Sequence, residues 1–356
     1  MKFLAFLFFA WSLLAAETAC ETPLHDPKAI EKCLDLALEV DDPDKAIEYL
    51  KKTLEAAKKQ DSDMTDTIAH AYHELSKNYA LKADYQNAIE AAKKAYHYAQ
   101  KAYGPKDNRT FVAATLLAME LSTTAQYSQA LDILKDLQRH FENPKTDEER
   151  KILAMIHNNI TLIYRKIDDP DSALKHAFKA LKIFEDLYGK EHPDTAAVYN
   201  NIGLLYWSMG KLDLAQKYYQ TSLEIKRKIL PPDHHDIYIT IGNLGALAYE
   251  KGDYTQALKF FTEAFRYFEK RFGPRHHTTA SFHYNLGITY EKLGEPQKAL
   301  HHLEKAKEIL EPILGPEHPD MRGIYEHLSN VYHTLGDKRK GDLYRKKVER
   351  LDKIAK

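Results

Sequence analysis

The sequence has almost no net charge and contains few cysteines, glycines and prolines. Among its 356 residues, 51 lysines and arginines balance 52 aspartates and glutamates, which leaves a formal net charge of −1. A protein that binds duplex nucleic acid neutralises several phosphates with basic side chains, so this balance argues against a nucleic-acid partner. With only 14 glycines and 14 prolines, and abundant Ala, Leu, Lys and Glu, the composition favours helices.

Sequence motifs of the common enzyme classes are also missing. The chain has no nucleophile elbow, no Walker phosphate-binding loop, no dinucleotide-binding fingerprint and no His-Glu-x-x-His zinc motif. Its many carboxylates are scattered along amphipathic segments, where a solvated helix face is the usual arrangement. The sequence therefore predicts a protein that is not an enzyme and that has no cofactor.

The one long apolar run lies at the N-terminus. Phe3–Ala16 is almost wholly apolar, follows a positively charged start and ends in small residues, after which the polarity rises with Glu21. The run is shorter than the roughly 20 residues that a membrane-spanning helix needs, and its pattern is typical of a secretory signal peptide. We expect a signal peptide at 1–16, an N-terminal segment at 17–26, and a secreted or periplasmic mature protein without a membrane span.

The two cysteines, Cys20 and Cys33, allow three interpretations. A disulfide between them would form in an oxidising compartment. Lipid attachment at Cys20 is less well supported, because Glu17-Thr18-Ala19 lacks the apolar residue that such a site normally has. We prefer the third interpretation, in which Cys33 is a small core residue with a free thiol and Cys20 lies in a loose segment.

A repeated segment fills the rest of the chain. The sequence Gly189-Lys-Glu-His-Pro-Asp194 has counterparts that begin at Pro231, Gly273 and Gly315, each 42 residues after the previous one. A small residue recurs at the same spacing, apart from one step of 43 residues, at Ala46, Ala88, Ala130, Ala173, Ala215, Ala257, Ala299 and Gly341. Eight units that begin near Pro27 therefore cover the mature chain and leave no room for a second domain.

Each unit has the pattern of two amphipathic helices. In one unit, Tyr199, Ile202 and Leu205 lie three residues apart and mark the apolar stripe of a first helix. Gly210 ends this helix, because glycine readily adopts the left-handed conformation that closes a helix C-terminus. A second helix follows from about Asp213 to Ile229.

These features resemble the tetratricopeptide repeat (TPR). The residues that carry the resemblance are Tyr199, Ile202-Gly203, Tyr206, Gly210, Ala215, Tyr219 and Ser222. The 42-residue period, the Gly-Pro-Glu-His-Pro-Asp loop and the Asn-Asn pair before the apolar-glycine pair are similar to the kinesin light chain class of TPR. A kinesin light chain itself is not implied, because the chain has no long heptad segment for a coiled coil.

The resemblance implies an all-α, right-handed α-solenoid of about eight TPR helix–turn–helix repeats. Residues 27–60 form a degenerate first repeat, in which Leu34 stands where glycine is expected. Residues 61–356 form the repeat array, and the match is strongest over 146–336.

In TPR proteins the first helix of each repeat lines a concave surface, so the resemblance implies a groove that binds a protein or peptide. Helical spacing assigns to this groove Asn158, Leu162, Arg165, Asn200, Leu204, Trp207, Tyr249, Tyr284 and Ile288. Trp207 is the best candidate for an anchor, because large aromatic side chains dominate interface energies. The alternative is that some of these side chains pack against the next repeat. The carboxylate clamp of some TPR proteins is not implied, because Leu162 and Leu204 stand where its asparagine would follow the motif glycine.

A second set of asparagines has a structural interpretation. Asn159, Asn201, Asn243 and Asn285 follow the first asparagine position and are expected to face the neighbouring repeat. We predict that they donate hydrogen bonds to loop backbone between repeats, since most side-chain hydrogen bonds go to backbone or water.

Histidines raise the question of a metal site. His192, His234, His276 and His318 recur once per repeat, and equivalent atoms of stacked repeats lie roughly 20 Å apart, too far to share one ion. We therefore expect the loop histidines to cap helix starts. His70 and His73 share a helix face, but the sequence shows no third ligand, so no metal site is predicted.

Together these observations predict an exported protein-interaction scaffold that binds an extended peptide or a partner helix in the groove. One alternative is a cytoplasmic, peptide-sensing or regulatory TPR protein, which would require the N-terminal run to be retained. The other is a metal-dependent enzyme built around His70 and His73. The sequence does not indicate an oligomeric state.

Overall fold

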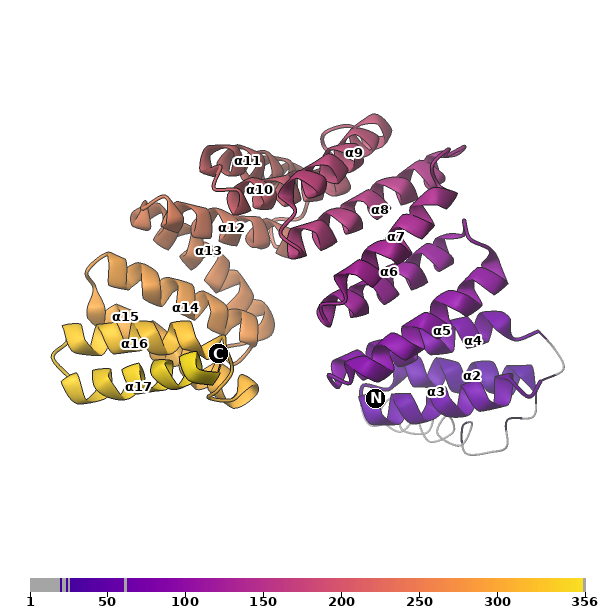
Figure 1. Cartoon of the computed structure of the whole chain (residues 1–356), viewed down its shortest axis with the longest axis horizontal. Helices are drawn as coiled ribbons and strands as arrows, with labels where there is room; N and C mark the ends of the chain where they lie inside the picture. Colours follow the sequence, from indigo (N-terminus) through magenta and orange to yellow (C-terminus); the bar gives the residue numbers. More distant parts are fainter. Residues whose placement is uncertain (1–19, 21–23, 25, 61–62, 355–356) are drawn as a thin grey trace, which may run out of the picture. The chain divides into compact units, whose positions relative to one another are not determined.

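The computed structural model describes Cys20, Leu24 and residues 26–60 and 63–354. The signal peptide predicted at 1–16 and most of the segment at 17–26 lie outside these described residues. Over the described residues the chain is made of sixteen α-helices and contains no strand (Figure 1). None of those helices has both the length and the apolar character needed to cross a membrane.

The helices form eight consecutive pairs, as the repeat spacing predicts. The first helices of the pairs are α2 (Pro27–Glu39), α4 (Thr65–Leu81), α6 (Asn108–Thr123), α8 (Asp147–Lys166), α10 (Pro193–Ser208), α12 (His235–Glu250), α14 (His277–Lys292) and α16 (Met321–Thr334). The second helices are α3 (Pro43–Ala57), α5 (Tyr85–Tyr103), α7 (Tyr127–His140), α9 (Pro170–Tyr188), α11 (Leu212–Ile229), α13 (Tyr254–Phe272), α15 (Pro296–Leu314) and α17 (Lys338–Ile354).

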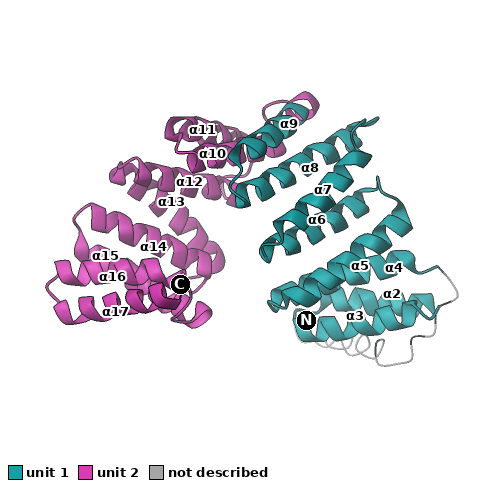
Figure 2. Ribbon diagram, in the orientation of Figure 1, with its two compact units in different colours: residues 1–183 teal, residues 184–356 magenta. Residues whose placement is uncertain are grey.

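The helices gather into two compact units, residues 1–183 and residues 184–356 (Figure 2). In unit 1 each helix from α2 to α7 contacts the next one along the chain, and the first helices α4, α6 and α8 also touch in succession. Unit 2 repeats this arrangement, with α10 against α12 and α14 against α16. Each unit is therefore a stack of helix pairs in which first helices lie beside first helices.

Small residues let the two helices of a pair approach closely. The recurring alanines from Ala46 to Ala299 are at most 1 % exposed. On the first helix, the motif glycine leaves equally little space. A Cβ atom added to Gly203 would lie 2.7 Å from the ring of Tyr219 on α11. Gly245 and Gly287 meet the second helices of their own pairs equally closely, at 2.8 Å and 2.7 Å. The motif glycine is thus required by an aromatic or leucine side chain opposite it.

The predicted histidine caps are present at the helix starts. Nδ1 of His192 accepts a hydrogen bond from the backbone N–H of Asp194 at 3.3 Å. Nδ1 atoms of His234, His276 and His318 accept the equivalent bonds at 3.2–3.3 Å. The imidazole nitrogen therefore takes the place of the Ser, Thr or Asp oxygen that usually satisfies these N–H groups.

Candidate functional site

The nine side chains predicted to line the groove all lie on first helices, and all are half-buried. Asn158, Leu162 and Arg165 lie on α8 in unit 1, whereas the other six lie on α10, α12 and α14 in unit 2. The structure therefore divides the predicted set between the two units.

In unit 2, members of the predicted set join α10 to α12. The indole N–H of Trp207 donates a hydrogen bond to the carboxylate of Glu250, 43 residues further along the chain. The side-chain amide of Asn243 donates to Oδ1 of Asn200 at 3.1 Å. Leu204 packs against the core that α10 to α13 share. One side of each of these residues is used to hold neighbouring repeats together.

The predicted residues on α12 and α14 are also half-buried, and those on α14 contact helices that follow in the chain. Burial raises the pKa of Tyr249 to about 12, so its phenol is neutral at physiological pH. Tyr284 meets His327 of α16 edge to face, with ring centroids 5.8 Å apart. His327 in turn lies with Nδ1 2.6 Å from a carboxylate oxygen of Glu291, and Ile288 packs against the core formed with α15 to α17.

Two of the four second asparagines, Asn159 and Asn243, bond to side chains of the preceding first helix, where loop backbone was expected. Asn243 donates to Asn200, as described above, and Asn159 of α8 donates to Oγ1 of Thr115 of α6 at 3.3 Å. The expectation was wrong for these two residues because first helices of neighbouring repeats are in direct contact, which brings side-chain partners closer than the loops.

Unit 1 has a hollow between α6 and α8 that contains two of the predicted residues, Leu162 and Arg165. Its volume is about 280 Å³, and its lining residues are Thr115, Ala118, Met119, Ser122, Thr123, Leu134, Asn159, Leu162, Ile163, Arg165 and Lys166. The lining includes two basic side chains and no acidic one. Asn159 lines this hollow, and Asn158, the residue that was predicted, does not.

Arg165 is the distinctive residue of the α6–α8 hollow. Its Nε atom is buried and has no hydrogen-bond partner within the described part of the chain. Leaving a buried donor unsatisfied costs about 1–3 kcal/mol, and more when the group is charged. Because Nε is closed off from solvent, an acceptor that enters the hollow would meet the other N–H groups of the guanidinium.

A second hollow in unit 1 lies between α4 and α6 and was not predicted as a binding site. It has a volume of about 320 Å³, and its lining residues are Asp66, Ala69, His70, His73, Glu74, Ala95, Ala99, Tyr103, Arg109, Val112 and Ala113. Four alanines form much of its wall, so small side chains create the space. The repeat register could have revealed it, since His73 and Glu74 occupy the positions that Asn158 and Asn159 hold two repeats later.

Neither hollow brings together a set of metal ligands. Among the described residues, the group of three ligand atoms close enough to share an ion belongs to His234, His235 and Asp236, all within 4.8 Å. Nδ1 of His234 already accepts the backbone N–H of Asp236 in the helix cap. His70 and His73 line the α4–α6 hollow without a third ligand atom at such a distance.

The geometry and the repeat pattern agree with the comparison to known families. The model of the tetratricopeptide repeat family matches residues 152–228, 236–311 and 281–340, a little over half of the chain. The chain belongs to the tetratricopeptide repeat family. None of the curated proteins matches its sequence.

Several solved TPR-like structures resemble the chain in fold. BtubC (BKLC) from P. vanneervenii is 20% identical over 65% of this chain and 92% of its own, with a TM-score of 0.57. A signal-transduction ATPase with a tetratricopeptide repeat sensor, from Pyrococcus horikoshii, is 17% identical over 91% of this chain and 49% of its own, with a TM-score of 0.59. A Rap protein complexed with competence and sporulation factor is 13% identical over 92% of this chain and 98% of its own, with a TM-score of 0.53. At these identities the likeness concerns the fold alone.

Two histidine pairs of this TPR protein, each with one buried and one half-buried ring, were missed in the sequence. The Nδ1 atoms of His157 and His176 lie 2.9 Å apart, and those of His283 and His302 lie 2.8 Å apart. Burial, with smaller effects of nearby histidines and lysines, lowers the pKa of all four imidazoles from 6.5 to about 4. Both pairs are 19 residues apart and occupy the same repeat positions, a signal that the register contained.

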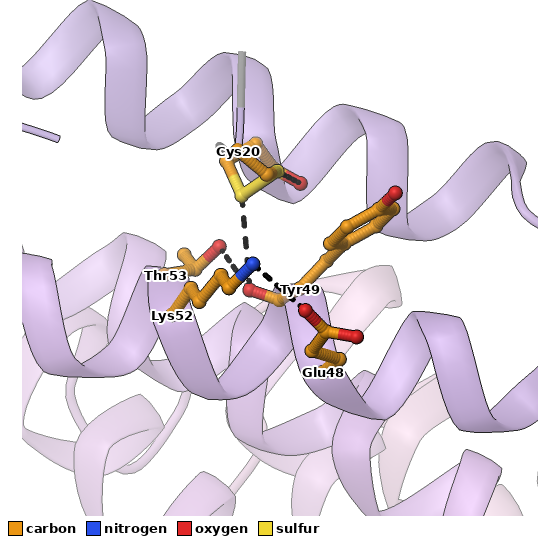
Figure 3. The surroundings of a disulfide bond; sticks show 6 residues. Cys20, Glu48, Tyr49, Lys52 and Thr53 are labelled. Carbon is orange, nitrogen blue, oxygen red and sulfur yellow. Dashed lines mark hydrogen bonds and ion pairs between the residues drawn. A yellow bond between two sulfur atoms is a disulfide. The ribbon is translucent and has the colours of Figure 1, made fainter. Parts of the chain in front are cut away.

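Cys20 and Cys33 form a disulfide in the TPR protein, so the preferred interpretation of two free thiols was wrong. Both cysteines are buried, 4% and 0% exposed, and Figure 3 shows Cys20 beside Tyr49 and Thr53 of α3. The disulfide and a lipid on Cys20 exclude each other, because both use the same sulfur atom. The bond ties the segment before α2 to the first repeat.

Proposed function

We propose that this TPR protein is an exported scaffold that holds an extended peptide or a partner helix against the first-helix face of its repeats. The observation that carries the proposal is the α6–α8 hollow, where Leu162 offers apolar surface and Arg165 has a buried Nε without a partner in the described chain. The guanidinium of Arg165 also lines this hollow, and N–H groups other than the buried Nε can donate to an oxygen atom of a ligand. Nothing in this role requires a catalytic group.

Export is supported by the N-terminus. The apolar run at Phe3–Ala16 has the pattern of a secretory signal, and disulfides such as Cys20–Cys33 persist in oxidising compartments. We expect N-terminal sequencing of the native protein to begin near Glu17, and thiol labelling to find no free cysteine before reduction. A cytoplasmic protein that keeps Met1 and has two reactive thiols would contradict export and favour the regulatory alternative.

The alternative keeps the same binding face and differs in compartment. The Rap structure, which is similar to this chain in fold, is a complex with competence and sporulation factor. A cytoplasmic protein with this fold would act as a sensor, so the sequencing experiment separates the two roles.

Peptide binding can be tested with a random peptide library displayed on phage. We expect selected peptides to bind the wild-type protein, and to bind Leu162→Glu at least about tenfold more weakly, a loss of about 1.4 kcal/mol. The matched control is Leu214→Glu on α11, where the leucine is 40% exposed on a second helix. Equal loss in both variants, or no selected peptide at all, would contradict a site on the first helices.

The same peptides test the unit 2 part of the predicted groove. Trp207 is the only tryptophan that remains once the signal peptide is removed, so its emission reports on the α10–α12 face. A ligand that extends into unit 2 should shift this emission, and Trp207→Ala should weaken its binding. A ligand that changes neither would be confined to unit 1.

A further inference from the structure

We infer that the first-helix face of unit 1 recognises an extended protein segment that carries one basic and one acidic side chain. The basic side chain would lie in the α4–α6 hollow and the acidic side chain in the α6–α8 hollow. The inference rests on the proposed peptide-binding function and adds the charge pattern of the ligand. Both hollows belong to unit 1 and both use α6 as a wall.

The α4–α6 hollow has the character of a site for a cationic side chain. Asp66 and Glu74 add two carboxylates to its lining, and His70 and His73 add imidazole nitrogens that can accept hydrogen bonds. Burial lowers the pKa of His73, which keeps its ring neutral and able to accept. The carboxylate of Glu74 forms an ion pair with Lys77, with Nζ 2.8 Å from Oε2.

The one basic residue in this hollow is already compensated. Arg109 bonds Asp107 through two nitrogens, Nε at 3.0 Å and Nη2 at 3.1 Å. Its guanidinium also stacks 3.5 Å from the ring centroid of Tyr103. Arg109 is therefore a fixed wall of the hollow, and the carboxylate of Asp66 interacts with it electrostatically without forming an ion pair within 4 Å among the described residues.

The α6–α8 hollow has the opposite character. Arg165 and Lys166 are its charged residues, and the buried Nε of Arg165 lacks an acceptor within the described chain. A carboxylate is the ligand group that fits best, because a guanidinium can bond it through two parallel N–H groups. Met119 and Leu162 provide apolar surface for the aliphatic part of an Asp or Glu side chain.

The separation of the hollows sets the spacing of the two charges. On α6 the first hollow uses Arg109, Val112 and Ala113, and the second uses residues from Thr115 to Thr123. The centres of these two sets are about eight residues, or ~12 Å, apart along the helix axis. At 3.6 residues per turn the two sets are about 100° apart around α6, which adds about 8 Å across the helix. The distance between the sites is thus about 15 Å.

An extended chain covers that distance in four or five residues, at about 3.3 Å per residue. Side chains four residues apart in an extended chain point to the same face, so the basic and the acidic side chain of the ligand can enter their two hollows at the same time. The ligand that fits is therefore an extended segment with a Lys or Arg four residues from an Asp or Glu. A segment with charges of one sign would place a repulsive group in one of the hollows.

The experiment uses a displayed library in which a lysine and a glutamate are fixed four residues apart and all other positions are random. Selected peptides are synthesised with blocked termini, and their affinities are measured by fluorescence anisotropy. We expect Asp66→Lys and Arg165→Glu to bind about tenfold or more weakly than the wild type. Replacing the peptide lysine by glutamate should restore binding to Asp66→Lys, and replacing the peptide glutamate by lysine should restore binding to Arg165→Glu.

Charge reversals on the second helix α7 provide matched controls. Asp132→Lys and Arg139→Glu lie on the exposed part of α7 and should leave affinity unchanged. If Arg165→Glu does not fold, as judged by circular dichroism, the exposed neighbour Lys166→Glu takes its place.

The outcomes separate this inference from the proposed function. Peptides from the unbiased library that bind, but are insensitive to both charge reversals or are not rescued by the reciprocal peptides, would overturn the charge pattern alone. If neither library yields a peptide, the peptide-binding function itself fails. Loss at both sites with reciprocal rescue would establish the inference.

Discussion

The two units share a repeat spacing but fill the same repeat positions differently. After the first helix, unit 2 has glycine in the left-handed turn at Gly210, Gly252, Gly294 and Gly336, whereas unit 1 has Ala83, Ala125 and Asp168 with φ of 56–59°. At the motif position on the first helix, unit 2 has glycine in three repeats. Unit 1 has Ser76, Ala118 and Thr161 in that position, as the repeat register shows.

These substitutions change how a helix pair is held together. Where glycine is present, the ring of Tyr219 or Phe261 lies directly on the first helix. Where Ser76 replaces it, the hydroxyl donates to the carbonyl of Ala88 on the second helix at 2.9 Å. Thr161 makes the corresponding bond to Ala173 at 3.3 Å. A polar bond thus replaces the packing contact wherever serine or threonine replaces the motif glycine, and Ser329 of unit 2 makes the same bond to the carbonyl of Gly341 at 2.9 Å.

The comparison teaches that the contacts between first helices are more open in unit 1, although unit 2 has a larger hollow, of about 910 Å³, along its second helix α13. The first helices of unit 2 are bridged by large side chains, such as Trp207 to Glu250. Those of unit 1 leave the two hollows, which small residues such as Ala113 and Ala118 help to form. Departure from the family pattern therefore coincides with space for a ligand.

A large effect is expected from placing the same side chain at equivalent positions in the two units. In Gly245→Val, the new Cβ would lie 2.8 Å from the ring of Phe261, and overpacking of this kind costs about 1–3 kcal/mol. Ala118→Val, at the same repeat position, borders the α6–α8 hollow, so its methyl groups have room and the cost should be below about 1 kcal/mol. Urea unfolding measures both, and equal losses would remove the contrast in packing.

Acid should destabilise both units, because each contains a histidine pair. The folded pKa of His283 is lowered from 6.5 to about 4, so the unfolded chain takes up a proton first as the pH falls. Stability is then intact above pH about 6.5 and declines down to about pH 4, by about 2–3 kcal/mol for this residue.

Tyrosines provide the matched replacement for a histidine pair. Tyr199 and Tyr218 occupy the same repeat positions in another repeat, with ring centroids 6.0 Å apart. In His283→Tyr/His302→Tyr, unfolding of unit 2 followed by Trp207 emission should lose most of its dependence on pH between about 7 and 4. The same change at His157 and His176, in unit 1, should leave that signal as in the wild type. An unchanged pH profile in the first variant would show that the pair is not the acid-sensitive element.

The spacing of 42 residues predicted the helix pairs and the cap histidines, because both depend on local chemistry that recurs in every repeat. His192 caps its helix through atoms only two residues apart, so no knowledge of neighbouring helices was needed. The assignment of the nine groove residues remains a prediction. The structure adds to it that Leu162 and Arg165 line a hollow and that Trp207 is bonded to the next repeat.

The repeat register marks His73 and Glu74 as groove positions, but the volumes of the hollows could not be predicted because they depend on side chains from three helices at once. The α4–α6 hollow exists because Ala69, Ala95 and Ala113 come from α4, α5 and α6 respectively. The disulfide was missed for a related reason, since the sequence shows two cysteines but not whether their backbones approach within 5.2 Å. The histidine pairs were within reach, because their register repeats across the two units.

The smallest expected effect concerns the turns, and it sharpens the comparison most directly. An L-residue in the left-handed conformation costs roughly 1–2 kcal/mol. Glycine avoids this cost, but it raises the conformational entropy of the unfolded chain, which lowers the free energy of unfolding by about 0.4–1 kcal/mol. Ala125→Gly in unit 1 should therefore stabilise the protein by about 0.5 kcal/mol, and Gly252→Ala in unit 2 should destabilise it by a similar amount. Asp168→Gly should change stability less, because aspartate tolerates this conformation better than alanine. Urea unfolding followed by circular dichroism measures all three, and a destabilising Ala125→Gly would mean that the turns of unit 1 are held by something other than their backbone preference.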